Sequence, residues 1–177
     1  RANLSADATS PPAWDPANPT QTSNFSTSVT LYDSLGSPHA AQIFFRKSGT
    51  GAWEWHAMTD GAGLTGGTAG QLTQIANGTL AFDAQGRLTT VTQSSAFNPV
   101  GATNPQALSF DFGDPTSGGG TGLAGITQFA SASAATFVGQ DGYAAGQLSG
   151  VRVEQDGRIS GIFTNGQTRV LGQVAVA

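Results

Sequence analysis

The 177-residue chain has no cysteine and very few charged residues. Without cysteine there can be no disulfide framework, no thiolate metal site and no thiol nucleophile. Charged residues make up 10% of the chain, whereas about a quarter is usual in globular proteins. Seven basic residues stand against eleven acidic ones, and the net charge is −4. Seven scattered cations do not form the basic stripe that binding to nucleic acid requires.

Long hydrophobic runs and helical patterns are missing as well. No apolar run approaches the roughly 20 residues of a membrane span, so no membrane insertion is predicted. A helical period is nowhere sustained for three turns, whereas short alternating runs between turn residues are common. This pattern predicts an all-β fold with at most one short helix.

The chain is rich in small and hydroxyl residues and has enough hydrophobic residues for a core. The chain has 25 glycines, ten phenylalanines and 38% hydrophobic residues, enough to build a core. At this length a chain buries roughly 70% of the surface that it exposes when unfolded. It begins at Arg1 rather than Met and stops on an apolar alternation, so we expect a fragment of a longer protein.

A proline-rich stretch precedes the first three expected strands, and a glycine-rich stretch follows them. Residues 1–24 hold four prolines within nine positions, which predicts an extended connector or an arm laid on a surface. Residues 59–71 hold five glycines and predict a loop. Between them, strands are expected at 27–32, 39–46 and 52–58.

The rest of the chain also predicts strands joined by tight turns. A compact hairpin is expected from 80–82 and 87–91 around the Asp83–Gly86 turn, and a short strand from 108–112. Residues 113–125 hold six glycines and predict another loop, and 126–137 predicts either a short helix or an irregular crossing. Asp-Gly and Asn-Gly turns predict a three-stranded meander with strands at 151–154, 158–163 and 167–176.

Candidate chemical groups are sparse. The two histidines, His39 and His56, show none of the spacings of a metal site, so polar residues on the solvent side of a sheet are the better interpretation. Most of the carboxylates lie next to or near Gly or Pro, where turns use Asp to bind the backbone. A glycosidase pair is therefore not favoured. We predict no catalytic, metal or cofactor site, and no enzyme.

Trp53 and Trp55 share one face of an expected strand, because side chains alternate with a period of two. They could form a sugar-stacking platform or anchor a core. Core or inter-domain packing is favoured, because aromatic side chains carry much of the buried area of a small core.

Several specific strings resemble the bacterial flagellar hook protein family, in family order along nearly the whole chain. Residues 28–39 (SVTLYDSLGSPH) resemble its LYDSLG-x-x-H signature, and 80–88 (LAFDAQGRL) its L-x-F-D/N-x-x-G-x-L hairpin. The later strings are ITQF at 126–129, QDGYAAGQL at 140–148 and DGRISGIFTNGQTRVLGQ at 156–173. Phe163 and Thr164 stand where the family often has Tyr and Ser.

The resemblance implies a division of the chain into parts of a hook subunit. Residues 1–24 would be the Pro-rich arm, 25–125 an inserted outer β domain that is barrel-like or sandwich-like, 126–137 a connector, and 138–177 the C-terminal part of a middle β domain. The helices with which the family begins and ends would lie outside this fragment.

The resemblance also implies a structural function. The subunit would assemble with copies of itself into the curved, extracellular tube that transmits torque from motor to filament, in contact with hook cap, rod and hook-filament junction proteins. A secreted carbohydrate-binding β module and a distal rod-type flagellar protein are the alternatives. The motif residues expected to have structural or interface roles are Leu31, Tyr32, Asp33, Gly36, His39, Trp53, Phe82, Asp83, Gly86, Gln140, Asp141, Gly142, Tyr143, Gly146, Asn165, Gly166 and Gln167.

Overall fold

A computed structural model describes residues 1–174 of the chain and confirms an all-β fold. Two single turns of 3-10 helix, η1 (Gly61–Gly63) and η2 (Thr116–Gly118), are the only helical elements in that range. The strands are β1 (Ala2–Asn3), β2 (Phe25–Tyr32), β3 (Pro38–Gly49), β4 (Ala52–Asp60), β5 (Leu72–Phe82), β6 (Leu88–Ser95), β7 (Ile126–Thr127), β8 (Ala134–Ala135), β9 (Leu148–Val153), β10 (Arg158–Phe163) and β11 (Thr168–Gln173).

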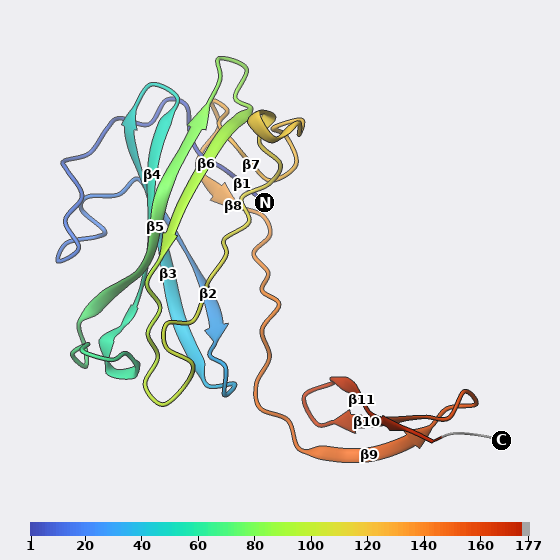
Figure 1. The fold of residues 1–177 in the computed structure, drawn as a ribbon. Coiled ribbons are helices and arrows are strands. Elements are labelled where there is room, and N and C mark those ends of the chain that lie inside the picture. The colour runs from blue at the N-terminus through green and yellow to red at the C-terminus, as the bar shows by residue number, and fades with distance from the viewer. Residues whose placement is uncertain (175–177) are drawn as a thin grey trace.

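The largest unit is a five-stranded antiparallel sheet in the order β2-β3-β4-β5-β6. Every neighbouring pair is joined by a hairpin connection, so the sheet is a simple meander with two open edges rather than a closed barrel (Figure 1). The predicted strands at 27–32, 39–46 and 52–58 all lie within it. The predicted 167–176 strand of the C-terminal unit corresponds to β11, and the prediction for residues 175 and 176 falls outside the described residues.

The main core lies on one face of this sheet. Trp53, Trp55 and Phe45 are almost completely buried there. The core is closed by Leu4 from the N-terminus and by Ile126. Both of these residues belong to or adjoin the small sheet β7-β1-β8, in which β1 pairs with β7 in parallel and with β8 antiparallel. The arrangement is therefore sandwich-like.

The opposite face of the sheet is partly covered too. Trp14 lies on it, stacked on His56 with ring centroids 4.0 Å apart and packed near Phe44. The expectation that both histidines lie on a solvent-facing side is therefore wrong: the His56 and His39 side chains are each only 10% exposed. The N-terminal stretch supplies the cover for His56, a long-range contact that alternation within a strand does not reveal.

Two further expectations are corrected by the structure, and the alternative left open for 126–137 is decided. The loop expected at 59–71 begins only at Gly61, because Thr59 and Asp60 belong to β4, and the strand expected at 80–82 is the end of the longer β5. Residues 108–112 form no strand, because the amides of Leu108 and Phe110 bind the Ser95 and Gln93 side chains instead of a neighbouring backbone. Residues 126–137 form an irregular crossing with two short strands and no helix.

The C-terminal meander is a separate three-stranded sheet in the order β9-β10-β11. Figure 1 shows it beyond the end of the large sheet at which the β2–β3 turn lies, connected by the extended segment that follows β8. Several of its apolar side chains are exposed, among them Val153 at 63% and Val170 at 62%. Within the described residues no helix is long and apolar enough to span a membrane.

Candidate functional site at the junction of the two sheets

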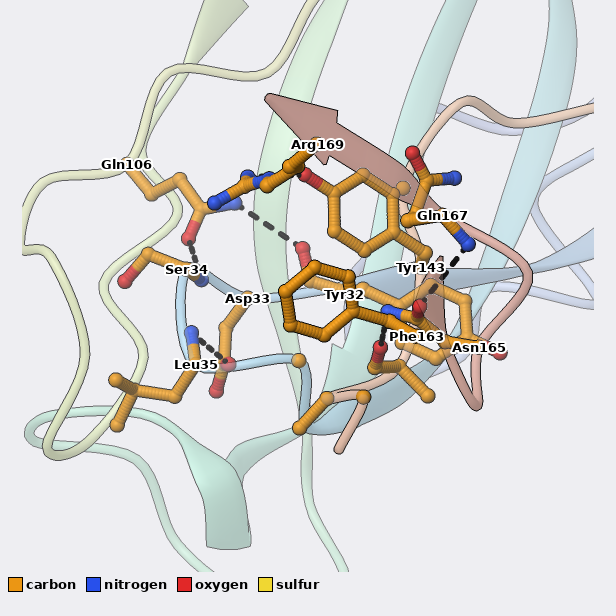
Figure 2. Close-up of a pocket in the computed structure, with 15 residues that line it drawn as sticks. Tyr32, Asp33, Ser34, Leu35, Gln106, Tyr143, Phe163, Asn165, Gln167 and Arg169 are labelled. Atoms are coloured by element: carbon orange, nitrogen blue, oxygen red, sulfur yellow. Dashed lines mark hydrogen bonds between the residues drawn. The ribbon is translucent and has the colours of Figure 1, made fainter. Parts of the chain in front are cut away.

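Three of the sequence motifs meet in one cleft between the large sheet and the meander (Figure 2). One wall is the turn between β2 and β3, the floor is the extended segment 142–146, and the other wall is the turn between β10 and β11. The lining residues are Tyr32, Asp33, Ser34, Leu35, Gly36, Gln106, Gly142, Tyr143, Ala144, Ala145, Gly146, Phe163, Asn165, Gln167 and Arg169.

Asp33 organises the first wall. Its Oδ1 accepts hydrogen bonds from the backbone N–H groups of Leu35 and Ser37, both at 2.9 Å. Its Oδ2 lies 3.2 Å from His39 Nε2. Burial favours a higher pKa for Asp33, but the bonds from Ser37, His39 and Leu35 together hold the pKa below its ordinary value. A carboxylate held in this way fixes the shape of the turn.

Gly36 has two reasons to be glycine. Its φ is +81°, a conformation that side chains of L-residues rarely adopt. A Cβ at this position would also lie 2.3 Å from the backbone nitrogen of Ala145. The turn of the large sheet and the segment 142–146 are therefore in direct backbone contact at Gly36.

Gln106 braces the same wall, and sequence reasoning did not identify it. Its side-chain oxygen accepts from Ser34 N at 2.8 Å, and its amide nitrogen donates to the Tyr32 carbonyl at 3.1 Å. Gln106 lies in an irregular stretch with no recognisable motif, so no local signal could have found it.

The second wall is held by Asn165 and Arg169. Asn165 Nδ2 donates to the Ala144 carbonyl at 2.8 Å, and its Oδ1 accepts from Gln167 N at 3.1 Å. Arg169 donates to the Tyr143 hydroxyl at 2.9 Å. Gly146 lets the Asn165 side chain approach, because a Cβ there would lie 2.4 Å from Asn165 Cγ.

The segment 142–146 is thus held from both sides. The large sheet contacts it through Gly36 and Tyr32, and the meander contacts it through Asn165 and Arg169. Of the motif residues, Tyr32, Asp33, Gly36, Gly142, Tyr143, Gly146, Asn165 and Gln167 line this cleft. Leu31 and His39 pair across β2 and β3 beside the cleft. Gln140 and Asp141, which come just before the segment 142–146, are exposed to solvent, and so is Gly166.

A second group of motif residues lies elsewhere, at the turn between β5 and β6. There Gly86, with φ +75°, is so close to the Gln128 carbonyl that a Cβ would lie 2.3 Å from it. Asp83 accepts from Arg87 through both backbone and guanidinium, and the first of these bonds is the main reason for its lowered pKa. Gln128 also accepts from Trp53 Nε1 at 3.3 Å. This turn holds the crossing 126–129 against the large sheet.

Neither place has the make-up of a reactive centre. Among residues 1–174 no group of three or more His, Asp or Glu side chains lies close enough to hold a metal ion. The cleft contains hydrogen bonds that fix turns and backbone contacts made possible by glycine. Such a constellation can set and maintain the position of two sheets.

The interpretation of Trp53 and Trp55 as a sugar-stacking platform is not supported. Both side chains are completely buried in the core, and Trp55 packs against Phe110 and Phe112 at centroid distances of 5.0 and 4.9 Å. A platform for a ligand needs an accessible ring face, so these residues act as core anchors.

Comparisons with known proteins agree with the motifs. Residues 3–143 match the family model of the flagellar basal body protein FlaE D2 domain. The flagellar hook protein FlgE of Helicobacter pylori (strain 26695) is 36% identical over 154 residues, which are 85% of this chain and 21% of that protein. FlgE of Treponema pallidum is 33% identical over 186 residues, covering 88% of this chain and 39% of that protein.

Among solved structures, the crystal structure of Helicobacter pylori FlgE2 aligns with 85% of this chain and 32% of its own, with a TM-score of 0.45 at 18% identity. The chain thus spans only a fifth to two fifths of the length of the relatives described above. Because the family model covers residues 3–143 of the 177, the chain belongs to the FlaE D2 domain family of flagellar basal body proteins.

Proposed function

We propose that this chain is the outer part of a structural subunit of the bacterial flagellar hook. In this function copies of the subunit assemble into a curved extracellular tube that transmits torque from motor to filament. The main support is that motif strings from three distant parts of the chain meet at one junction between two sheets. A subunit that bears torque needs such a junction, because force passes between its parts there.

We further propose the domain division that the family resemblance implies. The Pro-rich arm is 1–24, the outer inserted domain 25–125, the connector 126–137, and the partial middle domain 138–177. The five-stranded sheet falls within the second range and the described meander within the fourth, which supports the separation of these two ranges. Partners would be other copies of the subunit, together with hook cap, rod and hook-filament junction proteins.

No chemical step is assigned to the protein. Subunits that stack head to tail without closing form a helical tube, and this requires complementary surfaces rather than reactive groups. A chain with 10% charged residues has a low desolvation cost when copies touch each other. The distal rod alternative is less favoured, because the relatives described above are named hook proteins.

The test is genetic and structural. In the bacterium that encodes this protein, deletion of the gene should abolish hooks in electron micrographs and abolish swimming. Re-expression of the full-length protein should restore both, and an antibody against this chain should label the hook. Normal hooks in the deletion strain, or labelling of the rod alone, would contradict the proposal.

A further inference from the structure

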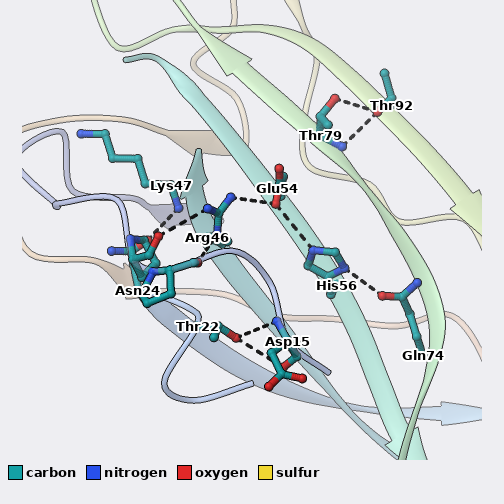
Figure 3. Close-up of polar contacts among 12 residues, drawn as sticks. Asp15, Thr22, Asn24, Arg46, Lys47, Glu54, His56, Gln74, Thr79 and Thr92 are labelled. Carbon is teal, nitrogen blue, oxygen red and sulfur yellow. Dashed lines mark hydrogen bonds and ion pairs between the residues drawn. The ribbon is translucent and has the colours of Figure 1, made fainter. Parts of the chain in front are cut away.

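Part of the N-terminal stretch forms a loop that lies on the face of the large sheet opposite to the main core. We define residues 10–23 as the covering loop. Its two ends are joined at the neck, where Asn24 Nδ2 donates to the Thr9 carbonyl at 2.7 Å and Asn24 Oδ1 accepts from Lys47 N at 2.7 Å. Within the loop, Asp15 and Thr22 are linked by hydrogen bonds (Figure 3).

Three contacts hold the covering loop down. Arg46 on β3 donates from Nε to the Pro12 carbonyl at 2.7 Å and from Nη2 to the Pro11 carbonyl at 3.3 Å. Trp14 lies flat on the His56 ring of β4, with an interplanar angle of 2° and a centroid distance of 4.0 Å. Trp14 also packs near Phe44 of β3, with ring centroids 5.8 Å apart. The loop therefore rests on one guanidinium, one imidazole and one phenyl ring.

Within residues 1–174, only one of the two ring nitrogens of the imidazole under the loop forms a hydrogen bond. His56 Nδ1 is 2.8 Å from Gln74 Oε1 on β5, so in the neutral ring it carries the hydrogen. His56 Nε2 is buried and has no hydrogen-bond partner in the described part of the chain. The charged groups that face the ring are Glu54, whose Oε2 lies 4.0 Å from Nε2, and Arg46. Gln74 and Trp14 are neutral.

We propose that protonation of His56 releases the covering loop from the sheet. A proton on Nε2 has no acceptor while the loop is closed, and an unpaired buried N–H of a cation is costly. Among residues 1–174 the carboxylate that lies beside Nε2 is that of Glu54, which already accepts from Arg46 at 3.0 Å. Moving Glu54 toward His56 loosens the guanidinium that holds Pro11 and Pro12, and lifting Trp14 lets water reach Nε2. Both responses open the loop.

The direction of the response follows from linkage. Burial, together with the nearby Arg46 charge, lowers the pKa of His56 and outweighs the opposing contributions of Gln74 and Glu54. In the open loop the ring is hydrated and takes up its proton near the ordinary value of 6.5. At pH values between the pKa of His56 in the closed loop and its pKa in the open loop, the open form binds more protons. Each fall of one pH unit in this range therefore favours the open form by up to about tenfold. The closed loop is therefore fully favoured at pH values above 6.5.

Acrylamide quenching of tryptophan fluorescence in the whole 177-residue chain tests this proposal. Trp53 and Trp55 are completely buried, so the signal that a Trp14→Phe variant loses reports on the covering loop. We expect the quenching constant of Trp14 to rise at least about threefold between pH 7.5 and pH 5.0 as the stack opens. A His56→Gln variant cannot take up the proton and should show the same constant at both pH values.

Each of the other outcomes overturns the proposal. An unchanged Trp14 quenching constant in the unsubstituted chain would show that the loop stays closed in acid. The same rise in the His56→Gln chain would assign the change to another group. A rise that is accompanied by quenching of Trp53 and Trp55, measured in the Trp14→Phe chain, would show global unfolding instead of loop release.

Discussion

Gly36 is the residue at which the large sheet touches the segment that leads to the meander. A Gly36→Ala substitution should cost the strain of a positive φ, about 1–2 kcal/mol, and in addition force apart the backbones of Gly36 and Ala145. We expect a larger loss of unfolding free energy in urea than for a turn glycine with free space around it. Backbone NMR should show shifted amides at Ala144 and Ala145.

Gly70 provides the matched control for this prediction. Its φ of +76° is almost the same as that of Gly36, but nothing lies within 4 Å of the position of a Cβ. Gly70→Ala therefore measures the strain alone. Equal losses of stability for the two variants would mean that the contact at Gly36 carries no weight, and would remove the main support for a rigid junction.

Asp33 makes the turn beside this contact dependent on pH. The pKa of Asp33 is lower in the folded chain than the ordinary 3.8, so its stabilising contribution is complete above 3.8 and is lost as the pH falls through the folded value. Asp33→Asn should destabilise the chain at pH 7 by about 1–2 kcal/mol, because one acceptor oxygen becomes a donor. The difference should shrink between pH 5 and pH 2 in urea titrations. A constant difference across that range would contradict this account of Asp33.

At the residue scale, sequence reasoning was limited by distance along the chain. The turn role of Asp33 and Gly36 is local, because side-chain oxygens bind nearby amides and glycine adopts positive φ. The second role of Gly36, its contact with Ala145, depends on how two sheets meet. His56 shows the same limit: strand alternation puts it on the other face of β4 from Trp55, but only the fold brings Trp14 over it.

At the scale of elements, β5 shows why an expected strand was too short. Asn77-Gly78 are residues typical of turns, but they lie in the middle of β5, paired with His56 and Trp55 of β4. Glycine is required there by close approach, since a Cβ would lie 1.9 Å from the Thr92 carbonyl and 2.7 Å from Trp55 Nε1. Glycine in a strand interior often marks such a close approach.

The contribution of the neck of the covering loop to the free energy of unfolding can be measured. Asn24→Ala removes the two bonds to Thr9 and Lys47 and leaves the Lys47 amide without its side-chain acceptor. We expect a loss of about 1–3 kcal/mol in unfolding free energy and faster hydrogen exchange at Lys47 and at the start of β2. Ser28→Ala, an exposed position on the same strand, should be close to neutral. Unchanged exchange at Lys47 in Asn24→Ala would contradict this prediction.

At the scale of the whole molecule, the two sheets differ in how they are stabilised. The large sheet has a core on one face and the covering loop on part of the other, whereas the meander exposes apolar side chains. The all-β class and the hairpin order followed from alternation and turn residues. The cover on these two faces did not, because residues 1–24 show no alternating pattern in the sequence and are placed by long-range strand pairing and packing.

This difference predicts unequal protection from hydrogen exchange within one molecule. Amides of β3, β4 and β5 should exchange only through global unfolding, because each of these strands pairs on both edges and their sheet packs on the main core. Amides of β9–β11 should exchange at least about a hundredfold faster, since Val151, Val153 and Val170 remain more than half exposed and local opening gives up little apolar burial. In the meander, β10 should be slowest, because it alone pairs on both edges. The experiment is exchange measured by NMR on a chain shown to be monomeric. Protection of β9–β11 equal to that of β3–β5 would mean that the meander is stabilised as strongly as the large sheet, and that its exposed side chains do not weaken it.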